Sequence, residues 1–590
     1  MDFLRLRGAG VSPGIAMAEA FLTERVVFSI RRTPIPASRT GAEVKRFREA
    51  VERTRVELAG VRDTIRAKVG EEHAFIFDAH LLILDDPTLV KDIERRIAEE
   101  RISAESALTE VHTHYAAIFD ALPDESMRER KADLTDVLTK LYRNLAPGEE
   151  GGEKPVAEGP TILVAHDLLP SEAALRFSRG NVLAVAMDMG GSTSHAAILA
   201  RSMSIPTVVG LHDITRRIRN GDVLVVDGTD GEVIVNPPAA VRKEFQGKKE
   251  KYDAYRREMH QVAGWKSATR DGVRFYPMAN IELPEEIHHA LSYGAEGVGL
   301  FRSEFIYLQR SSLPTEEEHF AVYSRLAREV APHPVYIRTI DIGGDKSLPF
   351  LNIEKEPNPA LGLRAVRFSL KYRELFRTQV RAILRASALG NVRVTIPMVT
   401  EIEEIGEIKL LFAEVKAELA AEGQPFDPHL PLGIMIEVPA AAALTDLLVR
   451  EVDYLSIGTN DLIQYYLAVD RSNEDVAYLY KPLHPSVLRL LRFIIETADK
   501  AGKEVAICGE MAADPLPAMV LLGLGLRRFS MNPIFIPRIK KALRTVEAKA
   551  VRRVVHQAMT LKSAQEVEEY LIEKLLVRHP EAFLKLGLTS

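Results

Sequence analysis

Apolar and polar residues alternate in a regular rhythm over the second half of the chain, from about residue 272 onward. Short apolar stretches typical of buried strands are separated by longer stretches whose apolar residues recur at helical spacing. Eight strand–helix units of this kind match a (β/α)8 TIM barrel, which typically needs about 250 residues. A doubly wound sheet alternates in a similar way, so the pattern favours the barrel without excluding the open sheet. The candidate strands are 273–280, 297–304, 335–341, 392–399, 432–438, 454–461, 504–510 and 526–532.

The first half of the chain has a different pattern. Short strand-like segments lie in residues 1–30 and 161–236, whereas residues from about 40 to 145 carry apolar positions at helical spacing with few glycines and prolines. We expect the flanking strands to pair with one another, which makes four or so antiparallel helices an insertion. The prediction is a multidomain α/β protein with four parts: an α/β domain of residues 1–38 and 146–237, a helical insert of 39–145, a linker helix of 238–266, and a C-terminal barrel of 267–590.

Composition narrows the possible partners and the location. The formal charge of −6 is small for 590 residues, and Lys and Arg are spread rather than blocked, so nothing points to nucleic acid. No uncharged apolar run reaches membrane-spanning length, and the N-terminus lacks the apolar core of a signal peptide. The single cysteine, Cys508, cannot form an internal disulfide. We therefore expect a cytoplasmic protein without membrane insertion.

Polar residues recur where the candidate strands end. In a (β/α)8 barrel the C-terminal strand ends meet at one mouth, and the active site lies there. We therefore expect these polar side chains to converge. They are Asn280, Arg302, Arg338, Glu437, Asn460 with Asp461, Cys508 and Asn532.

Two of the carboxylates and three arginines suggest phosphate chemistry. Glu437 and Asp461 each end an apolar strand, and two carboxylates that leave room for water and substrate oxygens suit Mg²⁺, with Mn²⁺ also acceptable. Arg302 and Arg338 are suited to grip a phosphate group, and Arg471 is a candidate for the same anion. A single arginine more often forms a surface ion pair, but the common placement at strand ends favours an anion site.

Cys508 and His195 are the candidate reacting groups. An isolated cysteine is more often buried and inert, but at the end of a barrel strand Cys508 is placed to protonate an enolate. His195 follows Gly190 and Gly191 at the predicted start of a helix, where free backbone N–H groups and the helix dipole would stabilise a phosphoryl group on the imidazole. Helix capping is the alternative role, and the glycine pair favours the phosphoryl carrier.

The segment GGSTSHAAILARSMSIPTVVG around His195 resembles the phosphohistidine signature of enzyme I of the bacterial sugar phosphotransferase system, the phosphoenolpyruvate-protein phosphotransferases. The resemblance runs nearly from end to end, through GVSPGIA, EEHAFIFDAHLLILDDP, DGTDGEVIVNP, GAEGVGLFRSEFIYL, IRTIDIGGDK, NPALGLRAVR, GIMIEVPAA, DYLSIGTNDLIQYYLAVDR and ICGEMAAD. So many long motifs in family order are highly specific. The resemblance implies that His195 takes a phosphoryl group from phosphoenolpyruvate bound with Mg²⁺ in the barrel. Pyruvate is then released, and the group passes to the carrier protein HPr, docked on the helical insert.

The resemblance also implies roles for individual residues. The implied substrate-binding residues are Arg302, Arg338, Asn460, Arg471, Arg364 and Lys346; the implied metal ligands are Glu437 and Asp461; the implied proton donor is Cys508. Family members are typically homodimers joined through the barrel. The chain departs from the family pattern at Leu169, where a threonine is frequent, and at Ala513, where a glycine is frequent. Both changes are expected to affect rates rather than identity.

Two other functions compete with this one. Pyruvate phosphate dikinase and phosphoenolpyruvate synthase share the carrier histidine and the barrel, but they need a nucleotide-binding domain. This chain has no glycine-rich phosphate loop before a Lys-Ser or Lys-Thr pair. A regulatory scaffold without turnover could dispense with His195, Cys508 or a metal carboxylate, and all of them are present. Both alternatives are therefore disfavoured.

Overall fold

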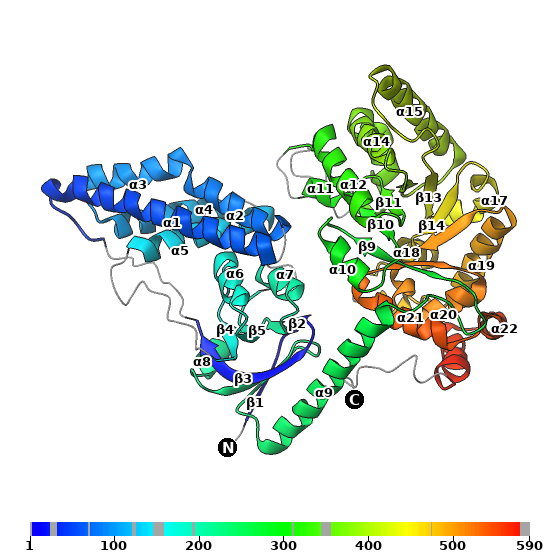
Figure 1. Cartoon of the computed structure of the whole chain (residues 1–590), viewed down its shortest axis with the longest axis horizontal. Helices are drawn as coiled ribbons and strands as arrows, with labels where there is room; N and C mark the ends of the chain where they lie inside the picture. Colours follow the sequence, from blue (N-terminus) through cyan, green and yellow to red (C-terminus); the bar gives the residue numbers. More distant parts are fainter. Residues whose placement is uncertain are drawn as a thin grey trace. The chain divides into compact units, whose positions relative to one another are not determined.

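The computed structural model describes residues 3–23, 32–68, 71–120, 125–145, 159–190, 195–308, 312–343, 356–471, 473 and 475–578. These residues form two compact units, the first ending at Tyr255 and the second beginning at Arg256. The division falls inside α9 (Ala239–Ala263), a charged helix that begins in the first unit and ends in the second (Figure 1). None of the described helices combines the length and the apolar character needed to cross a bilayer.

The first unit contains a mixed eight-stranded sheet in the order β1-β8-β7-β3-β4-β5-β6-β2. N-terminal strands pair with strands from beyond residue 160: β3 runs parallel to β4 and antiparallel to β7, and β1 pairs with β8. This confirms the expected pairing across the helical segment. The strands are β1 (Leu4–Arg7), β2 (Ala9–Ser12), β3 (Ile15–Leu22), β4 (Thr161–Ala165), β5 (Val182–Met187), β6 (Thr207–Val209), β7 (Val223–Asp227) and β8 (Glu232–Val235).

Helices of the first unit form a bundle and cover the sheet. The described part of the chain between residues 40 and 145 contains five helices, one more than the pattern indicated, and they lie alongside one another (Figure 1). Their shared core includes Phe47, Ile93, Leu108 and Val137, all fully buried. The helices of this unit are α1 (Thr40–Lys68), α2 (Glu71–Leu84), α3 (Pro87–Glu100), α4 (Ala104–Asp120), α5 (Glu125–Leu145), α6 (Pro170–Ser178), α7 (His195–Ser202) and α8 (Ile214–Arg217).

The second unit is a closed parallel barrel of eight strands, which confirms the predicted fold of this region. Each strand pairs with the next in sequence, and β16 pairs with β9 to close the ring. The strands are β9 (Tyr276–Ile281), β10 (Val298–Arg302), β11 (Val335–Arg338), β12 (Val392–Ile396), β13 (Leu432–Ile436), β14 (Tyr454–Ile457), β15 (Glu504–Ile507) and β16 (Arg528–Met531). All eight lie within or overlap the strand segments predicted from the sequence.

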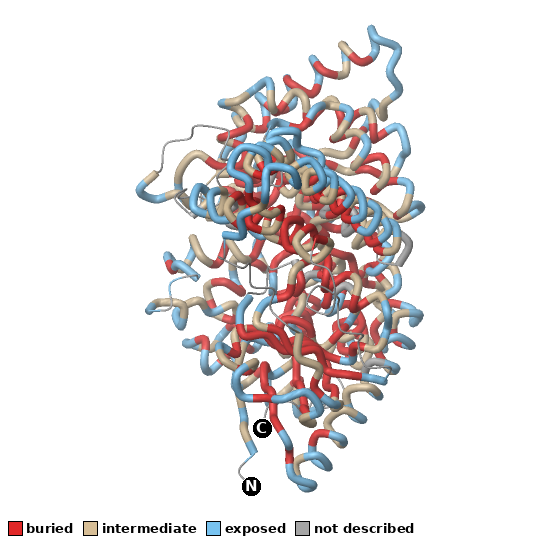
Figure 2. Tube along the Cα trace, turned by 90° about the vertical axis from the view of Figure 1, so that its left-hand side faces the viewer, coloured by how far each residue is buried: buried red, intermediate tan, exposed pale blue. Residues whose placement is uncertain are grey.

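Helices surround the barrel. They are α10 (Glu286–Ser292), α11 (Phe305–Leu308), α12 (Glu316–Val330), α13 (Ala365–Lys371), α14 (Arg373–Ser387), α15 (Ile402–Ala421), α16 (Pro439–Ala443), α17 (Thr445–Leu448), α18 (Thr459–Leu467), α19 (Pro485–Lys500), α20 (Pro515–Leu524), α21 (Ile536–Thr545), α22 (Ala548–Ala558) and α23 (Ala564–Leu571), with the short turns η4 (Glu510–Ala512) and η5 (Pro533–Phe535) among them. Most residues of the barrel strands are buried, and most of the surrounding helices alternate between buried and exposed residues. Figure 2 colours the whole chain by burial.

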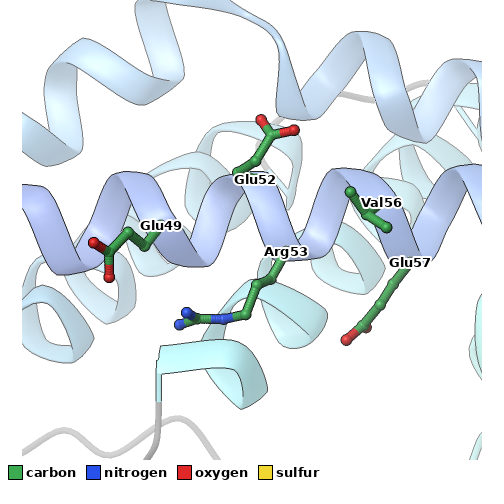
Figure 3. A pocket seen from close by; sticks show the side chains of 5 residues that line it. All are labelled: Glu49, Glu52, Arg53, Val56 and Glu57. Atoms are coloured by element: carbon green, nitrogen blue, oxygen red, sulfur yellow. The ribbon is translucent and has the colours of Figure 1, made fainter.

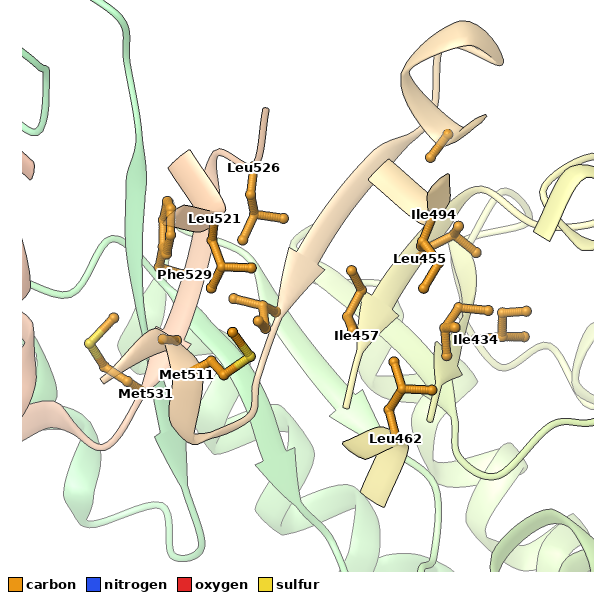
Figure 4. Packing of buried hydrophobic residues seen from close by; sticks show 14 of the residues in the cluster. Ile434, Leu455, Ile457, Leu462, Ile494, Met511, Leu521, Leu526, Phe529 and Met531 are labelled. Carbon is orange, nitrogen blue, oxygen red and sulfur yellow. The ribbon is translucent and has the colours of Figure 1, made fainter. Parts of the chain in front are cut away.

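The largest hydrophobic core lies between the strands and the surrounding helices. Figure 4 shows Ile434 of β13 with Leu455 and Ile457 of β14 near Leu462 of α18 and Ile494 of α19. Neighbouring residues on each strand point the other way, into the lumen, because side chains alternate along a strand. Tyr336 and Tyr454, for example, belong to a separate lumen cluster. This alternation decides which strand-end residues enter the mouth of the barrel.

Candidate active site

Because every second side chain of a barrel strand faces the lumen, polar residues near the strand ends lie at the C-terminal end of the lumen. Two residues after Tyr336 comes Arg338, and two residues after Met435 comes Glu437. Cys508 clusters with Leu300 and Met435. The predicted convergence of strand-end residues at one mouth is therefore confirmed for the arginine, the carboxylate and the thiol.

Two buried arginines lie among three carboxylates at this mouth. Arg338 donates a hydrogen bond from Nη2 to Glu304 Oε1, and its Nη1 lies 3.2 Å from Asp341 Oδ2. Nη2 of Arg364 lies 3.1 Å from Asp341 Oδ1 and 3.2 Å from Asp461 Oδ2. Burial works against the charged form of both arginines, but the carboxylates outweigh it and raise their pKa values. Both guanidinium groups therefore remain cationic, joined through Asp341.

Glu437 is an almost fully buried carboxylate in a crowded position. Its Oε1 accepts a 2.7 Å hydrogen bond from the backbone N–H of Met398. Burial, together with the nearby carboxylates Asp461 and Asp341, raises the pKa of Glu437 to about 8, even though two guanidinium groups act in the opposite direction. The mouth therefore holds more carboxylate than its buried arginines neutralise, and a bound cation would relieve this imbalance.

Cys508 presents a protonated thiol to the lumen. Its Sγ accepts a long hydrogen bond, 3.6 Å, from Ser456 Oγ. Burial raises the pKa of the Cys508 thiol to about 11, and the charge of Glu437 acts in the same direction. At neutral pH the sulfur therefore keeps its proton, which is the state that a proton donor needs.

Asn460 is held beside η4. Its Nδ2 donates to Glu510 Oε1 at 3.1 Å, and its Oδ1 accepts from the Glu510 backbone N–H at 2.8 Å. This contact requires the segments after β14 and β15 to approach closely. A Cβ atom on Gly509 would lie 1.8 Å from Thr459 Oγ1, so only glycine fits there.

Two predicted anion-binding arginines lie at the margin of this cluster. Arg302 donates to Glu282 Oε1 at 2.6 Å, and its side chain is 37% exposed. Arg471 is exposed, and its Nη2 lies 3.7 Å from Asp461 Oδ1. Lys346 lies outside the described residues.

Two of the strand-end asparagines have local structural contacts. Asn532 accepts a hydrogen bond from the backbone N–H of Ile534 at 3.2 Å and so caps η5. Asn280 donates to the backbone carbonyl of Cys508 at 2.8 Å and accepts from Ser530 Oγ at 2.6 Å. Asn280 therefore stabilises the segment that carries the thiol, whereas Asn532 stabilises only the turn η5 that it caps.

Sequence reasoning missed Glu304 and Asp341, which hold Arg338. Each follows the last residue of its strand by two or three positions, at a place where the backbone has left the ladder. A signal was present, because both lie inside motifs, FRSEF and RTIDIGG, that were noted for their arginines. The carboxylate that pairs with a buried arginine is identified only from the folded structure.

The chain is similar to known proteins over nearly its whole length. The matching family models are those of PEP-utilising enzymes: the N-terminal part over residues 7–130, the mobile domain over 157–231 and the PEP-binding domain over 256–548. Relatives from Bacillus sp. (strain S) and Geobacillus stearothermophilus, both named phosphoenolpyruvate-protein phosphotransferase, are 40% identical over 96% of this chain and 97% of their own. A solution structure of an Enzyme I (nEIt) protein is 37% identical over 42% of this chain and 99% of that chain, with a TM-score of 0.37.

The chain belongs to the phosphoenolpyruvate-protein phosphotransferase family. This confirms the resemblance and the predicted enzyme class. The protein is a transferase that uses phosphoenolpyruvate, and the match to the PEP-binding domain covers every strand of the barrel.

Glu437 and Asp461 are the carboxylates that the sequence predicts as ligands of a divalent cation. No three His, Cys, Asp or Glu side chains of the described residues gather closely enough to hold a metal ion by themselves. The raised pKa of Glu437, caused by burial and by neighbouring carboxylates, shows that this carboxyl group favours its protonated form unless a cation takes the place of the proton. Two carboxylates completed by water and substrate oxygens are a usual arrangement for Mg²⁺.

His195 of this phosphotransferase is the first residue of α7, at the sheet edge where β4 and β5 end. Gly190 has a φ of 106°, in the left-handed region that favours glycine. Residues 191–194 and the side chain of His195 lie outside the described part. A second histidine is described near this edge: His166 Nδ1 lies 3.0 Å from Asp188 Oδ2.

Both departures from the family pattern have structural explanations. Leu169 is the residue before α6 and gives no side-chain cap, but Asp136 of α5 takes that place. Asp136 accepts hydrogen bonds from the backbone N–H of Ser171 at 2.9 Å and from its hydroxyl at 2.6 Å. Ala513 has a φ of −92°, an ordinary right-handed conformation, so its methyl group causes no backbone strain.

A surface hollow lies elsewhere, on α1 in the first unit. It is lined by Glu49, Glu52, Arg53, Val56 and Glu57, with Val56 65% exposed (Figure 3). All five side chains come from one helix, and none belongs to the groups predicted for phosphoryl transfer. The hollow therefore lies on the helical insert and is not part of the barrel mouth.

Proposed function

We propose that His195 takes the phosphoryl group of phosphoenolpyruvate bound at the barrel mouth and passes it to the histidine of HPr. This would be the first step of the sugar phosphotransferase system. The observation that carries the proposal is the combination of two buried, cationic arginines, Arg338 and Arg364, with the carboxylates Glu437 and Asp461 and the protonated thiol of Cys508. These groups suit a substrate that carries a phosphate and becomes an enolate.

The proposed reaction uses each group once. Arg338, with Arg302 and Arg471 at the margin, binds phosphate oxygens, while Asn460 holds the carboxylate end; Arg364 and Lys346 are further members of the pocket. An imidazole nitrogen of His195 bonds to phosphorus as the bond from phosphorus to the enol oxygen breaks. The electron pair stays with that oxygen, and the enolate carbon takes the proton from Cys508 Sγ to give pyruvate. The raised pKa of the thiol supports this role, because the proton is present at neutral pH.

Glu437 and Asp461 are proposed to hold Mg²⁺, with Mn²⁺ as an acceptable substitute. The cation would neutralise negative charge on the phosphate and enolate oxygens. The excess of buried carboxylate around Glu437 supports this assignment.

The remaining proposals rest on membership of the family. We infer that HPr docks on the helical insert of residues 39–145, that two chains associate through the barrel of residues 267–590, and that the protein works in the cytoplasm. Sedimentation analysis of the full chain tests the association, and a monomer at micromolar concentration in the presence of Mg²⁺ and phosphoenolpyruvate would contradict it.

The central experiment is incubation of the full chain with labelled phosphoenolpyruvate and Mg²⁺, followed by mass-spectrometric mapping of the phosphorylated residue. We expect an acid-labile, base-stable label on His195 that is lost when HPr is added. The variant His166→Ala is the matched control, since it removes another histidine of the same sheet edge and should keep the label. Label retained by His195→Ala would refute the assignment.

A further inference from the structure

Gln379 is a fully buried amide on α14, on the outer side of the barrel. Its Oε1 accepts a 3.0 Å hydrogen bond from the backbone N–H of Ile340. Its Nε2 donates to Ser303 Oγ and to Tyr323 OH, both at 2.9 Å. All three partners are completely shielded from solvent. One side chain therefore joins the segment after β10, the segment after β11 and helix α12.

This amide lies where the sheet stops holding the two strands together. β10 and β11 are hydrogen-bonded neighbours, and Arg302 opposite Arg338 is the last pair in their register. Ser303 and Ile340 follow those arginines by one and two residues, beyond the ladder. Beyond the ladder, the Gln379 amide links the two segments. Its oxygen accepts a hydrogen bond from the Ile340 N–H after β11, and its nitrogen donates one to Ser303 Oγ after β10.

The tethered segments carry the carboxylates that hold Arg338. Glu304 follows Ser303 directly, and Asp341 follows Ile340 directly. Both carboxylates form ion pairs with the Arg338 guanidinium. A shift of either segment would therefore move a counter-ion of Arg338 and, through it, the guanidinium itself.

The orientation of the Gln379 amide is itself fixed. The oxygen must face Ile340, because the partner there is an N–H donor. Tyr323 OH, the outer partner, also contacts His319 Nδ1 at 3.0 Å. Burial raises the pKa of the Tyr323 hydroxyl, so it stays protonated and able to hydrogen-bond. The amide therefore has one arrangement that satisfies its partners.

We propose that Gln379 is a positioning residue for phosphoryl transfer: it holds the segments after β10 and β11 so that Glu304 and Asp341 aim Arg338 at the phosphate. The inference rests on the proposed function in one respect, the contact between Arg338 and the phosphate. Gln379 touches no substrate atom and acts only through these two carboxylates.

The test compares Gln379→Met with two matched variants of the full chain. Tyr323→Phe removes only the outer hydrogen bond of the amide. Tyr454→Phe removes a buried hydroxyl at the opposite end of the lumen, where it contacts Thr395 at 2.8 Å and the Val394 carbonyl at 2.7 Å. Single-turnover pyruvate release with Mg²⁺ is measured against phosphoenolpyruvate concentration, at a temperature where thermal unfolding shows every variant to be folded.

We expect Gln379→Met to raise the half-saturating phosphoenolpyruvate concentration about tenfold or more, because small displacements of a binding group are costly. Both tyrosine variants should stay within about threefold of the parent chain. Inhibition by pyruvate, which lacks the phosphate, should change less than about threefold in Gln379→Met, since the displaced group is a phosphate contact. If Gln379→Met does not fold, Ser303→Ala is used instead, because it removes only the hydrogen bond between Ser303 and Gln379. It should raise the half-saturating phosphoenolpyruvate concentration several-fold, by the same reasoning.

The proposal is overturned if Gln379→Met, or Ser303→Ala in its place, loses thermal stability as Tyr454→Phe does but keeps the parent phosphoenolpyruvate dependence. The amide would then be structural only. The variant Arg338→Lys reports on the proposed function separately. Unchanged phosphoenolpyruvate dependence in Arg338→Lys would refute the phosphate contact, and the positioning role with it.

Discussion

The two ends of the barrel lumen contain the same kinds of residue in opposite electrostatic conditions. At the N-terminal end, Glu504 lies between Arg393, 2.6 Å away, and Arg528. Burial disfavours ionisation of Glu504, but the two guanidinium groups outweigh it and lower its pKa. At the C-terminal mouth, burial and neighbouring carboxylates instead raise the pKa of Glu437 to about 8.

Aromatic rings complete the difference. The Arg393 guanidinium lies 5.2 Å from the centre of the Tyr336 ring, and that of Arg528 lies 4.5 Å from the centre of the Tyr276 ring. The N-terminal end therefore satisfies its own charges. The mouth leaves carboxylate in excess and a protonated thiol facing the lumen. In this barrel, unbalanced charge marks the end where substrate and cation are expected, and balanced charge marks the end that stabilises the fold.

The largest expected effect is the difference in activity between variants that lose an arginine at one end of the lumen or at the other. Arg338→Ala should lower kcat/KM for phosphoenolpyruvate by about 10³-fold, because a preorganised cation is lost from a buried anion site. Arg393→Ala, a loss of the same group at the other end, should stay within about threefold when assayed below its unfolding temperature. The measurement is pyruvate release by the full chain. Equal losses in both variants would remove the functional distinction between the two ends.

Removal of the mouth thiol comes next in size. Cys508→Ala should slow pyruvate formation by about 10²-fold, since general acid catalysis of proton transfer to the enolate is lost. Ser456→Ala removes only the hydrogen bond to the sulfur and is the control, with an expected change of a few-fold at most. Rapid-quench measurement of pyruvate checks both. Normal turnover by Cys508→Ala would exclude the thiol as the proton donor.

A cation should stabilise one end only. With Mg²⁺ at about thirty times its dissociation constant, the unfolding free energy of the parent chain should rise by about 2 kcal/mol. Glu437→Gln should lose this increase, whereas Glu504→Gln should retain it. Thermal unfolding with and without Mg²⁺ measures the difference. A full Mg²⁺ effect in Glu437→Gln would place the cation elsewhere.

The smallest effect concerns pH. Because the pKa of Glu504 is lowered on folding, its ionised form contributes stability above the ordinary glutamate pKa, and this contribution is lost as the pH falls through the folded value. Glu504→Gln should therefore be less stable than the parent by about 1 kcal/mol at pH 7. The difference should shrink as the pH falls below about 4.3. Denaturant unfolding at several pH values tests this, and a deficit that grew on acidification would contradict it.

Much of the barrel was predictable because its signals repeat along the chain. Every strand is an apolar stretch, and every second residue of a strand faces the same side. Arg338, Glu437 and Cys508 could therefore be assigned to one mouth from their positions alone. The same reasoning overstated strand length at several C-terminal ends, since residues such as Asp341 share the apolar context but have already left the ladder.

The sequence by itself thus indicated eight strand–helix units that favour a barrel, a helical segment inserted into an α/β domain, and the residue types at the strand ends, whereas closure of the ring was shown by the pairing of β16 with β9. Tertiary structure decided how these groups are held: Asp341 joins two arginines, Asp136 caps α6 where Leu169 cannot, and Gln379 tethers two strand ends. Periodicity shows which face a side chain occupies, because it is a local property of one element. Hydrogen bonds and ion pairs between side chains far apart in sequence depend on how several elements pack, so only the folded chain reveals them.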